Sequence, residues 1–515
     1  MDIWWSLTAD VDKICLLLLM LILSVIYLWR NRLSDIPNGP FSFPFTGNGK
    51  ILQDKPHINL TVLKDQYGRI YSIKLGKQRA IVVCSHEGIV EALIKLSPKL
   101  CGRPKMFLPQ GFFKGNHEAG VCFSELNMKY KIKKDFVLHS LNSISCSEEL
   151  SDVVMNEIQG VIALLLEKKA ALEILPLFES IFLRLMLYIV NGKLYQGDDV
   201  NFKEILRTFQ YRADELHQKW LSVTSPLLSS FNQRNRTELI ERTQLQFEYQ
   251  RDIVNRHKDC FNPDIISDVV DHGLLMLERY DDMGELDQSE LDTLFIELCG
   301  TGYRQLASTI SWLILYIASF PNIQHKVYTE LISVIGKERL PKLSDQPNLP
   351  YTTAVILETQ RLASVMPLLY PHITVEDVTF SGFNIPKDTV VLFNVWSVHH
   401  DAKYWKQPMK FDPDRFIKDG CLHIPDHYLP FGEGLRACPG ENITDVLLFL
   451  FASHIMFHVS AKLLDDSDLE GNFHGFVLTP KPYAAEFIPR ETVVNDVLDI
   501  PDSRDTVCYM DGLEI

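Results

Sequence analysis

A short glycine-rich segment near the C-terminus constrains this chain more than any other feature. Residues 431–440 are Phe-Gly-Glu-Gly-Leu-Arg-Ala-Cys-Pro-Gly, and an apolar, helix-like run from Asp445 to Phe457 follows. The glycines permit a tight turn that aims backbone N–H groups at the Cys438 sulfur, and the following helix presents its positive end to that sulfur. Both effects favour a thiolate, which can ligate iron. On these residues alone, a turn around an inert buried cysteine is the commoner interpretation.

The composition indicates a large folded body. With 515 residues, 46% of them hydrophobic and 23% charged, the chain can bury a sizeable core as one big domain or two smaller ones. A formal net charge of -15 argues against bulk affinity for nucleic acid, so no nucleic-acid partner is expected. The 10 cysteines are scattered without a Cys-x-x-Cys pair, which favours a reducing compartment over a zinc site or a disulfide framework.

The N-terminus carries a membrane signal. Ile14 to Trp29 contains no charged residue, and tryptophans and a tyrosine flank it as in an interfacial belt. A cleavable signal peptide has a similar apolar length. Acidic residues before the segment and Arg30 and Arg32 after it favour a retained anchor, with the bulk of the protein on the cytosolic side. Residues 1–33 are therefore predicted to be a single membrane anchor.

The rest of the chain is predicted to be one mainly helical α+β domain at 34–490. Prolines stiffen the entry to this domain between Ile36 and Asn48. Alternating residues from Ile70 to Cys84 and strand-like runs between Ile373 and Phe393 predict a smaller β-rich region, whereas Val153 to Lys337 has the pattern of long amphipathic helices. Residues 491–515 are acidic and weakly patterned, which predicts a disordered tail.

Several motifs resemble those of one family. The pattern Phe-x-x-Gly-x-Arg-x-Cys-x-Gly at 431–440 resembles the haem-binding signature of the cytochromes P-450, with every defining position filled. Glu358-Thr-Gln-Arg361 and Phe411-Asp-Pro-Asp-Arg-Phe416 resemble two further blocks of that family, in the family's order. Val395 to Asp401 is similar to microsomal members of animals and other eukaryotes. The resemblance implies the cytochrome P-450 fold, haem b as the cofactor and Cys438 as the axial ligand of its iron.

The resemblance also implies a set of cofactor contacts. Arg436 offers a forked donor to a haem propionate, Phe431 shields the sulfur, and Gly432 lets the backbone approach the flat cofactor. Tyr130 and Lys134 stand where the family has a tryptophan and an arginine, and both can donate to a propionate. His372 is a further propionate donor by resemblance, although a lone histidine before a strand is often a packing residue. Arg103 also matches a family position, with a plain turn residue as the alternative.

Glu358 and Arg361 lie three residues apart, on one face of the expected helix. In the family this pair is completed by an arginine from a loop, here Arg415, to form an ion-pair network. Without the resemblance, a helical Glu and Arg at this spacing are usually a solvated surface pair.

The chain departs from the family where a long helix is expected to cross the haem on its oxygen side. Thr301-Gly302-Tyr-Arg-Gln-Leu306 stands where the family usually has Ala-Gly-x-Asp/Glu-Thr-Thr. Gly302 is kept, but Arg304 and Gln305 replace the acid and the alcohol that organise proton delivery to oxygen. Gln305 can still orient a water molecule, whereas Arg304 cannot supply a proton.

Three functions remain open from the sequence. The first is a monooxygenase that inserts one oxygen atom from dioxygen into a lipophilic substrate, with electrons from NADPH-cytochrome P-450 reductase and with cytochrome b5 as a further partner. It would reside in the endoplasmic reticulum membrane, and the basic stretch Lys129 to Lys134 would attract an acidic electron donor. The second is an isomerase or dehydratase of hydroperoxides or endoperoxides, which needs no oxygen-activating relay. The third is a non-catalytic haem-binding protein. Apolar residues at 106–113, 365–370 and 475–478 fall where the family lines its substrate pocket.

Overall fold

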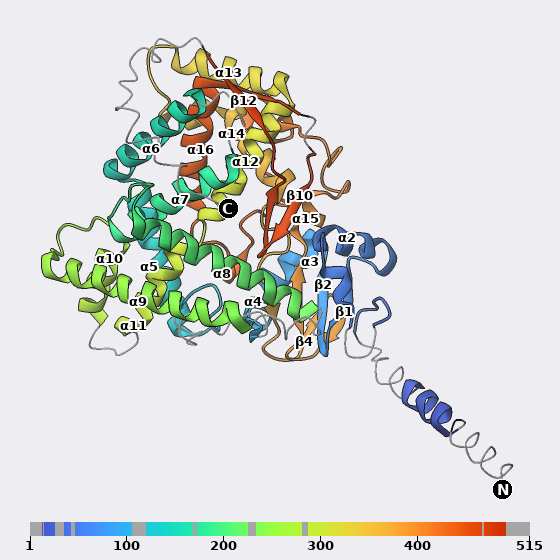
Figure 1. The fold of residues 1–515 in the computed structure, drawn as a ribbon. Coiled ribbons are helices and arrows are strands. Elements are labelled where there is room, and N and C mark those ends of the chain that lie inside the picture. Colours follow the sequence, from blue (N-terminus) through green and yellow to red (C-terminus); the bar gives the residue numbers. More distant parts are fainter. Residues whose placement is uncertain are drawn as a thin grey trace, which may run out of the picture.

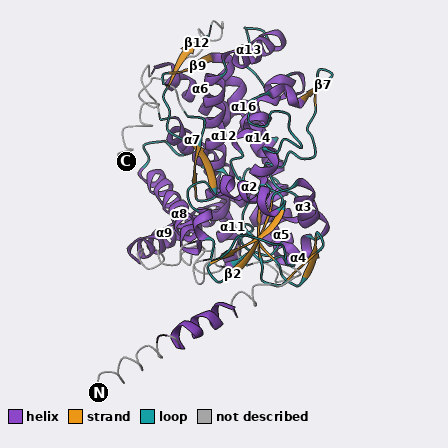
Figure 2. Ribbon diagram, turned by 90° about the vertical axis from the view of Figure 1, so that its right-hand side faces the viewer, coloured by secondary structure: helices purple, strands orange, loops and turns teal. Residues whose placement is uncertain are grey.

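The structure is a computed structural model that describes residues 13, 15–25, 36–42, 47–105, 120–167, 173–224, 233–280, 287–465 and 468–490. Helices make up most of the body and the strands form small sheets (Figure 2). The mainly α fold with a smaller β region is as predicted. The predicted tail at 491–515 and the apolar segment 106–113 lie outside the described residues.

A short apolar helix, Cys15–Val25, projects away from the body beside the N-terminus (Figure 1). Its leucines are exposed, for example Leu17 at 61%. The rest of the predicted Ile14–Trp29 segment lies outside the described residues. Among the described residues, one helix is long and apolar enough to cross a membrane, α7 (Ile174–Asn191), but it is mostly buried in the body and therefore serves as a core helix.

The β region is built on a four-stranded sheet of order β1-β2-β6-β3. β1 (Ile70–Leu75) and β2 (Gln78–Val83) form the antiparallel pair that the alternating sequence predicts, and β2 runs parallel to β6 (Val390–Phe393). Tyr71, Ile73 and Leu75 point into a core shared with α2 because successive strand residues face opposite sides. The other strands form four two-stranded sheets. Their bounds, with that of β3, are: β3 His372–Ile373, β4 Val378–Phe380, β5 Phe383–Ile385, β7 Ile417–Lys418, β8 Cys421–Leu422, β9 Val459–Leu463, β10 Gly471–His474, β11 Val477–Pro480 and β12 Ala485–Pro489.

The α-helices of the body begin with α2 and run to α16. Their bounds are: α2 Pro56–Tyr67, α3 His86–Val90, α4 Ser97–Leu100, α5 Met128–Ser145, α6 Glu148–Glu167, α8 Val200–Thr224, α9 Gln233–Cys260, α10 Val269–Tyr280, α11 Gln288–Gly300, α12 Tyr303–Ser319, α13 Pro321–Ile335, α14 Pro350–Ala363, α15 Val395–His399 and α16 Glu441–His458.

The main core surrounds α7, α12 and α16, whose residues are almost all buried. α11 starts with a capping box in which Asp287 and Glu290 bond each other's backbone N–H groups. The long helix predicted to cross the site is divided into α11 and α12. Thr301 is extended and Gly302 has a φ of 89°, a left-handed conformation that ends one helix and starts the next.

Candidate active site

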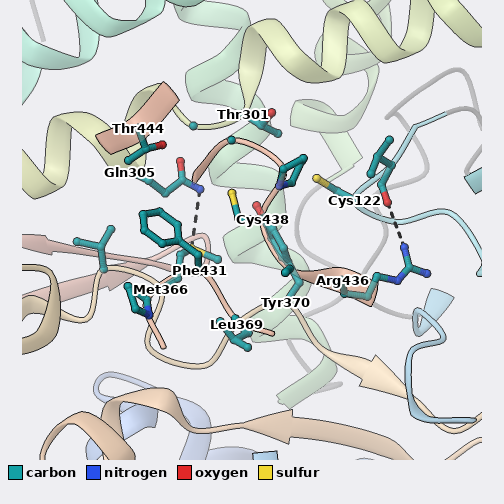
Figure 3. A pocket seen from close by; sticks show the side chains of 18 of the residues that line it. Cys122, Thr301, Gln305, Met366, Leu369, Tyr370, Phe431, Arg436, Cys438 and Thr444 are labelled. Atoms are coloured by element: carbon teal, nitrogen blue, oxygen red, sulfur yellow. Dashed lines mark hydrogen bonds between the residues drawn. The ribbon is translucent and has the colours of Figure 1, made fainter. Parts of the chain in front are cut away.

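A cavity of about 260 Å³ lies at the centre of the body, between the α11–α12 wall and the loop that carries Cys438 (Figure 3). Cys438, Phe431, Gly432 and Arg436 line it from the loop. The segment 365–370 lines a third side, as the sequence predicted for a substrate pocket. The cavity therefore collects most of the predicted site residues from distant parts of the chain.

The Cys438 loop is closed by its own backbone. The Cys438 N–H donates to the Phe431 carbonyl oxygen at 3.0 Å, and Gly432 and Gly434 both have a φ of 70°. A Cβ on Gly434 would lie 1.8 Å from the Leu93 carbonyl oxygen, so only glycine fits there. Gly440 has an ordinary φ of -96° and caps α16. Two of the three glycines are thus required by a left-handed turn.

Two opposing effects act on the pKa of the Cys438 thiol. Its accessible surface faces the cavity, and burial raises the pKa of the thiol to about 11 although a backbone N–H near Gly440 acts in the opposite direction. Desolvation thus acts against the thiolate, and the backbone N–H acts in its favour. A bound cation such as iron displaces the thiol proton and supplies the missing stabilisation.

Two arginines lie at the base of the cavity: half-buried Arg436 within the Cys438 loop and buried Arg103 beside it. Arg436 donates to the carbonyl oxygens of Cys101, Val121 and Ser124 and stacks on the Tyr130 ring at 4.2 Å. Arg103 donates to three other carbonyl oxygens, those of Cys122, Tyr370 and Pro371. Burial, followed by the charge of Arg436, lowers the pKa of Arg103 to about 10.

The other predicted propionate contacts are placed close to this pair. The Tyr130 hydroxyl and the Lys134 ammonium both donate to the Leu435 carbonyl oxygen at 2.7 Å. His372 gives its Nδ1 proton to the Leu100 carbonyl oxygen, and burial holds its pKa well below the usual value. The neutral ring therefore leaves Nε2 as an acceptor, which does not suit the donor role expected from the sequence.

The remaining donors fit an anionic group such as the haem propionates. An arginine has five N–H donors and a lysine three, so Arg103, Arg436 and Lys134 retain donors beyond the bonds described. No carboxylate in the described part of the chain forms an ion pair with any of the three. Arg103 is buried and the other two are half-buried. Because cations removed from water require compensation, this cluster favours an anionic ligand at the edge of the cavity.

The structure brings Glu358, Arg361 and Arg415 into one buried network. Arg361 binds both Glu358 carboxylate oxygens, at 2.7 and 2.9 Å, and Arg415 Nε donates to the same carboxylate at 3.1 Å. The side chains of Glu358 and Arg361 are 0% exposed, so this is not a solvated surface pair. The Asp412 N–H completes the set of donors to Glu358.

A neutral histidine links this network to the cysteine loop. Arg361 Nη1 donates to the His399 carbonyl oxygen, and the Leu429 N–H donates to His399 Nε2 at 3.0 Å. Burial and the charge of Arg361 hold the pKa of His399 well below the usual value. The proton therefore resides on Nδ1, 2.9 Å from the Ser364 hydroxyl. The start of the cysteine loop is thus tied to the ion pairs on α14.

The opposite wall departs from the family in its contacts as well as in its residues. Arg304 faces away from the main cavity and binds Glu179 at 3.0 Å and His474 at 3.1 Å. Gln305 lines the cavity, with its amide nitrogen 3.8 Å from the Met366 sulfur (Figure 3). Gly302 has no heavy atom within 4 Å of the position of a Cβ, so its backbone conformation alone favours glycine.

Four polar residues on this wall form a stripe, and only Gln305 among them has a role predicted from the sequence. Glu297, Thr301, Gln305 and Thr309 all line the cavity and are spaced by four residues. The signal in the sequence is this spacing itself, because polar residues at every fourth position of an apolar helix share one face.

The predicted basic stretch on α5 is weaker at the surface than its sequence indicates. Lys133 is 1% exposed and points into the body. Lys129 pairs with Glu290 at 3.2 Å, and Lys134 binds the cysteine loop. Lys131 remains exposed.

The fold and the cavity, with a cysteine loop facing a helix wall, define a haem-thiolate type of protein, and the comparisons identify the family. Residues 37–487 match the family "Cytochrome P450", so this chain belongs to the cytochrome P450 family. It is 28% identical to human cytochrome P450 1B1, over 96% of this chain and 95% of that protein. It is 29% identical to steroid 17-alpha-hydroxylase/17,20 lyase of Oryzias latipes, over 94% of this chain and 97% of that protein.

Among solved structures, a zebrafish cytochrome P450 with progesterone matches with a TM-score of 0.76 and 26% identity. The match covers 84% of this chain and 99% of that one. The predicted cytochrome P-450 fold is therefore confirmed. As a member of this family the chain is an oxidoreductase of the haem-thiolate monooxygenase class, with haem b as cofactor, a redox partner and a lipophilic substrate.

Proposed function

We propose that this chain is a monooxygenase that inserts one oxygen atom of dioxygen into a lipophilic substrate, with electrons from NADPH-cytochrome P-450 reductase. The observation that carries this proposal is the cavity that holds Cys438 at one wall, apolar residues of 365–370 at another, and Arg103 and Arg436 at its edge. Each of these features serves a different part of the same cofactor and its substrate.

Cys438 would be the axial ligand of the haem iron. Arg436, Lys134 and Tyr130 would bind the propionates, with Arg103 as a further donor. When bound, haem supplies the binding and activation of dioxygen. The chain itself orients the substrate, excludes water and holds the cysteine in place through the Glu358 network.

The substrate class is narrowed by the apolar wall and by the relatives. Val365, Met366 and Leu369 give the cavity an apolar side that suits a lipophilic molecule. Because one relative is named a steroid hydroxylase and a solved relative holds progesterone, steroids are the first compounds to test.

The proposed membrane location is supported by the exposed N-terminal helix. Its exposed leucines need an apolar partner, and a lipid bilayer provides one. We place the protein in the endoplasmic reticulum membrane, with one span and with the catalytic domain in the cytosol. Lys131 remains as an exposed charge that attracts an acidic donor such as the reductase or cytochrome b5.

A second candidate is a rearrangement of hydroperoxides or endoperoxides. The observation that favours it is the engagement of Arg304 by Glu179 and His474, which leaves no acid at the family's relay positions. Such an enzyme receives its oxygen–oxygen bond from the substrate and needs no proton relay to dioxygen.

Two measurements test these proposals. With reduced haem and carbon monoxide, the wild type is expected to show the red-shifted Soret band of a thiolate ligand, and Cys438→Ala is expected to lose it. Cys122→Ala is the matched control, because this second thiol also lines the cavity. Product with reductase and NADPH supports the monooxygenase. Product with an organic hydroperoxide substrate alone supports the rearrangement, and no product in either assay supports a binding protein.

A further inference from the structure

The polar stripe on the α11–α12 wall contains one carboxyl group. The stripe residues are spaced by four positions, so that each lies about one helical turn after the last: Glu297, Thr301, Gln305 and Thr309. The Thr301 hydroxyl donates to the Glu297 carbonyl oxygen at 2.9 Å, and the Thr309 hydroxyl donates to the Gln305 carbonyl oxygen at 2.8 Å. The stripe thus runs along the cavity through the break at Gly302.

Reduction of dioxygen consumes protons, and most titratable groups around the cavity cannot supply them near neutral pH. Arg103 and Arg436 stay protonated. Burial keeps His372 and His399 neutral by holding their pKa values well below the usual value, and it raises the pKa of the Tyr370 hydroxyl and of the Cys122 thiol.

Two carboxyl groups remain among the described residues that line the cavity, Glu297 and Glu433. Glu433 belongs to the cysteine loop, on the side that carries the sulfur. Glu297 is on the opposite wall and is only 4% exposed. A proton donor for the side of the cavity that faces α12 is therefore Glu297.

The surroundings of Glu297 hold it in place and favour its protonated form. Its two oxygens accept the Val121 N–H, at 2.5 Å, and the Cys122 N–H, at 3.1 Å. Burial raises its pKa, although these two bonds, a hydrogen bond from the Cys122 thiol and the charge of Lys133 act in the opposite direction. This direction of shift is the one that a proton donor requires, and the cavity places the carboxyl where it can release a proton.

Glu297 also lines a second cavity. A smaller cavity of about 80 Å³ adjoins the wall, and Glu297, Thr301 and Gln305 line both cavities. Arg304 and Arg212 line the smaller cavity from its other side. Beyond Arg304 lies His474, whose Nε2 is 3.2 Å from the exposed Asp214 carboxylate. Glu297 and Arg304 therefore share the smaller cavity, and His474 and Asp214 extend from Arg304 towards the surface.

We propose that Glu297 is the carboxylic acid that delivers the protons consumed by dioxygen reduction in this cavity, with Thr301 and Gln305 positioning the water that carries them. The inference rests on the proposed monooxygenase function. Each turnover takes two electrons from the reductase and two protons through Glu297, inserts one oxygen atom into the substrate and releases the other as water. The carboxylate left behind is reprotonated from the smaller cavity.

The first test measures the proton directly. Infrared difference spectra of the haem-loaded protein without substrate or reductase, recorded across a pH titration, are expected to show the carbonyl stretching band of a protonated carboxylic acid that persists at neutral pH. The band is expected to be absent from Glu297→Gln and present in Asp292→Asn. Asp292 is a buried carboxyl on the same helix that does not line the cavity. A spectrum of Glu297→Gln identical to the wild type overturns the proposal.

The second test separates a proton donor from a structural tie. Glu297→Gln is expected to lower kcat with reductase and NADPH by about 10²-fold or more and to raise the solvent isotope effect on kcat. Its carbon monoxide spectrum, substrate affinity and thermal unfolding temperature are expected to match those of Asp292→Asn.

Two outcomes of that kinetic test contradict the proposal. One is an unchanged kcat. The other is a loss of kcat that is accompanied by an equal loss of substrate affinity or of haem, because the Val121 and Cys122 bonds alone would then explain it. If the wild type shows no turnover with reductase, the proposed function fails, whereas the infrared band still decides whether Glu297 holds a proton.

Discussion

The two walls of the central cavity are built in different ways. The cysteine side consists of residues 431–440 with Glu358, Arg361 and Arg415, and the helix side consists of Glu297 to Thr309 on α11 and α12. On the cysteine side the charged network has several fixed contacts, such as the four donors to the Glu358 carboxylate. On the helix side, Arg304 and Gln305 replace the acid and the alcohol of the family motif, and Arg304 binds Glu179. The part that holds the cofactor is thus tightly specified, whereas the part that tunes the chemistry has changed.

The largest expected effect is on the cysteine side. Glu358→Ala leaves the fully buried Arg361 without its carboxylate, which is expected to cost about 3–5 kcal/mol of unfolding free energy. The variant is expected to lose most of its bound haem, as measured by the carbon monoxide spectrum per mole of protein.

Asp414→Asn is the matched control for that change. Asp414 pairs with Lys326 at the surface, with 61% of its side chain exposed, so its loss is expected to change stability by less than about 0.5 kcal/mol. Equal effects of the two variants would show that the network is not the element that holds the cysteine side.

Replacement of glycine by alanine can be compared directly between the two walls of the cavity. Gly434 and Gly302 both have left-handed φ values, 70° and 89°. Replacing either by alanine is expected to cost about 1–2 kcal/mol of unfolding free energy because of this backbone conformation. A Cβ at position 434 would also collide with the Leu93 carbonyl oxygen, whereas a Cβ at position 302 would have no heavy atom within 4 Å.

Gly434→Ala is therefore expected to lose about 3 kcal/mol or more of stability, and Gly302→Ala only the smaller cost of its backbone conformation. Urea unfolding followed by circular dichroism measures both. A larger loss at Gly302 would contradict the view that the helix side is the less constrained wall.

On the helix side, Arg304→Met removes the cation that binds the buried Glu179. Burial already raises the pKa of Glu179, and the variant leaves its carboxyl without a charged partner, which is expected to cost about 1–3 kcal/mol. Adding Glu179→Gln is expected to recover part of the loss in a double-mutant cycle. Independent, additive effects in the cycle would mean that the pair does not stabilise this wall.

The smallest expected effect concerns a single hydrogen bond on the cysteine side. Tyr130→Phe removes one of the two donors to the Leu435 carbonyl oxygen, while Lys134 remains. The expected loss is about 0.5–1.5 kcal/mol in thermal unfolding, with the position of the carbon monoxide band unchanged. A shifted band would mean that this contact influences the cysteine and not only its loop.

The sequence predicts those features that depend on local patterns. The β1–β2 pair follows from alternation, the helices from 153 to 337 follow from their periodicity, and the fold follows from the family motifs. The burial of Lys133 and the raised pKa of Cys438 were not predicted, because both depend on what packs against them from elsewhere in the chain. The division of the long helix at Thr301 also depends on context, since a single glycine is compatible with a continuous helix.

The segment 120–124 couples the two walls. Arg436 of the cysteine loop holds its carbonyl groups, and Glu297 of α11 holds its N–H groups. A change in charge at either end therefore alters the same five residues, so cofactor loading and substrate fit are expected to be linked equilibria in this enzyme. Ligand affinities measured with haem-depleted protein would then differ from those of the complete enzyme even where the ligand never touches the haem.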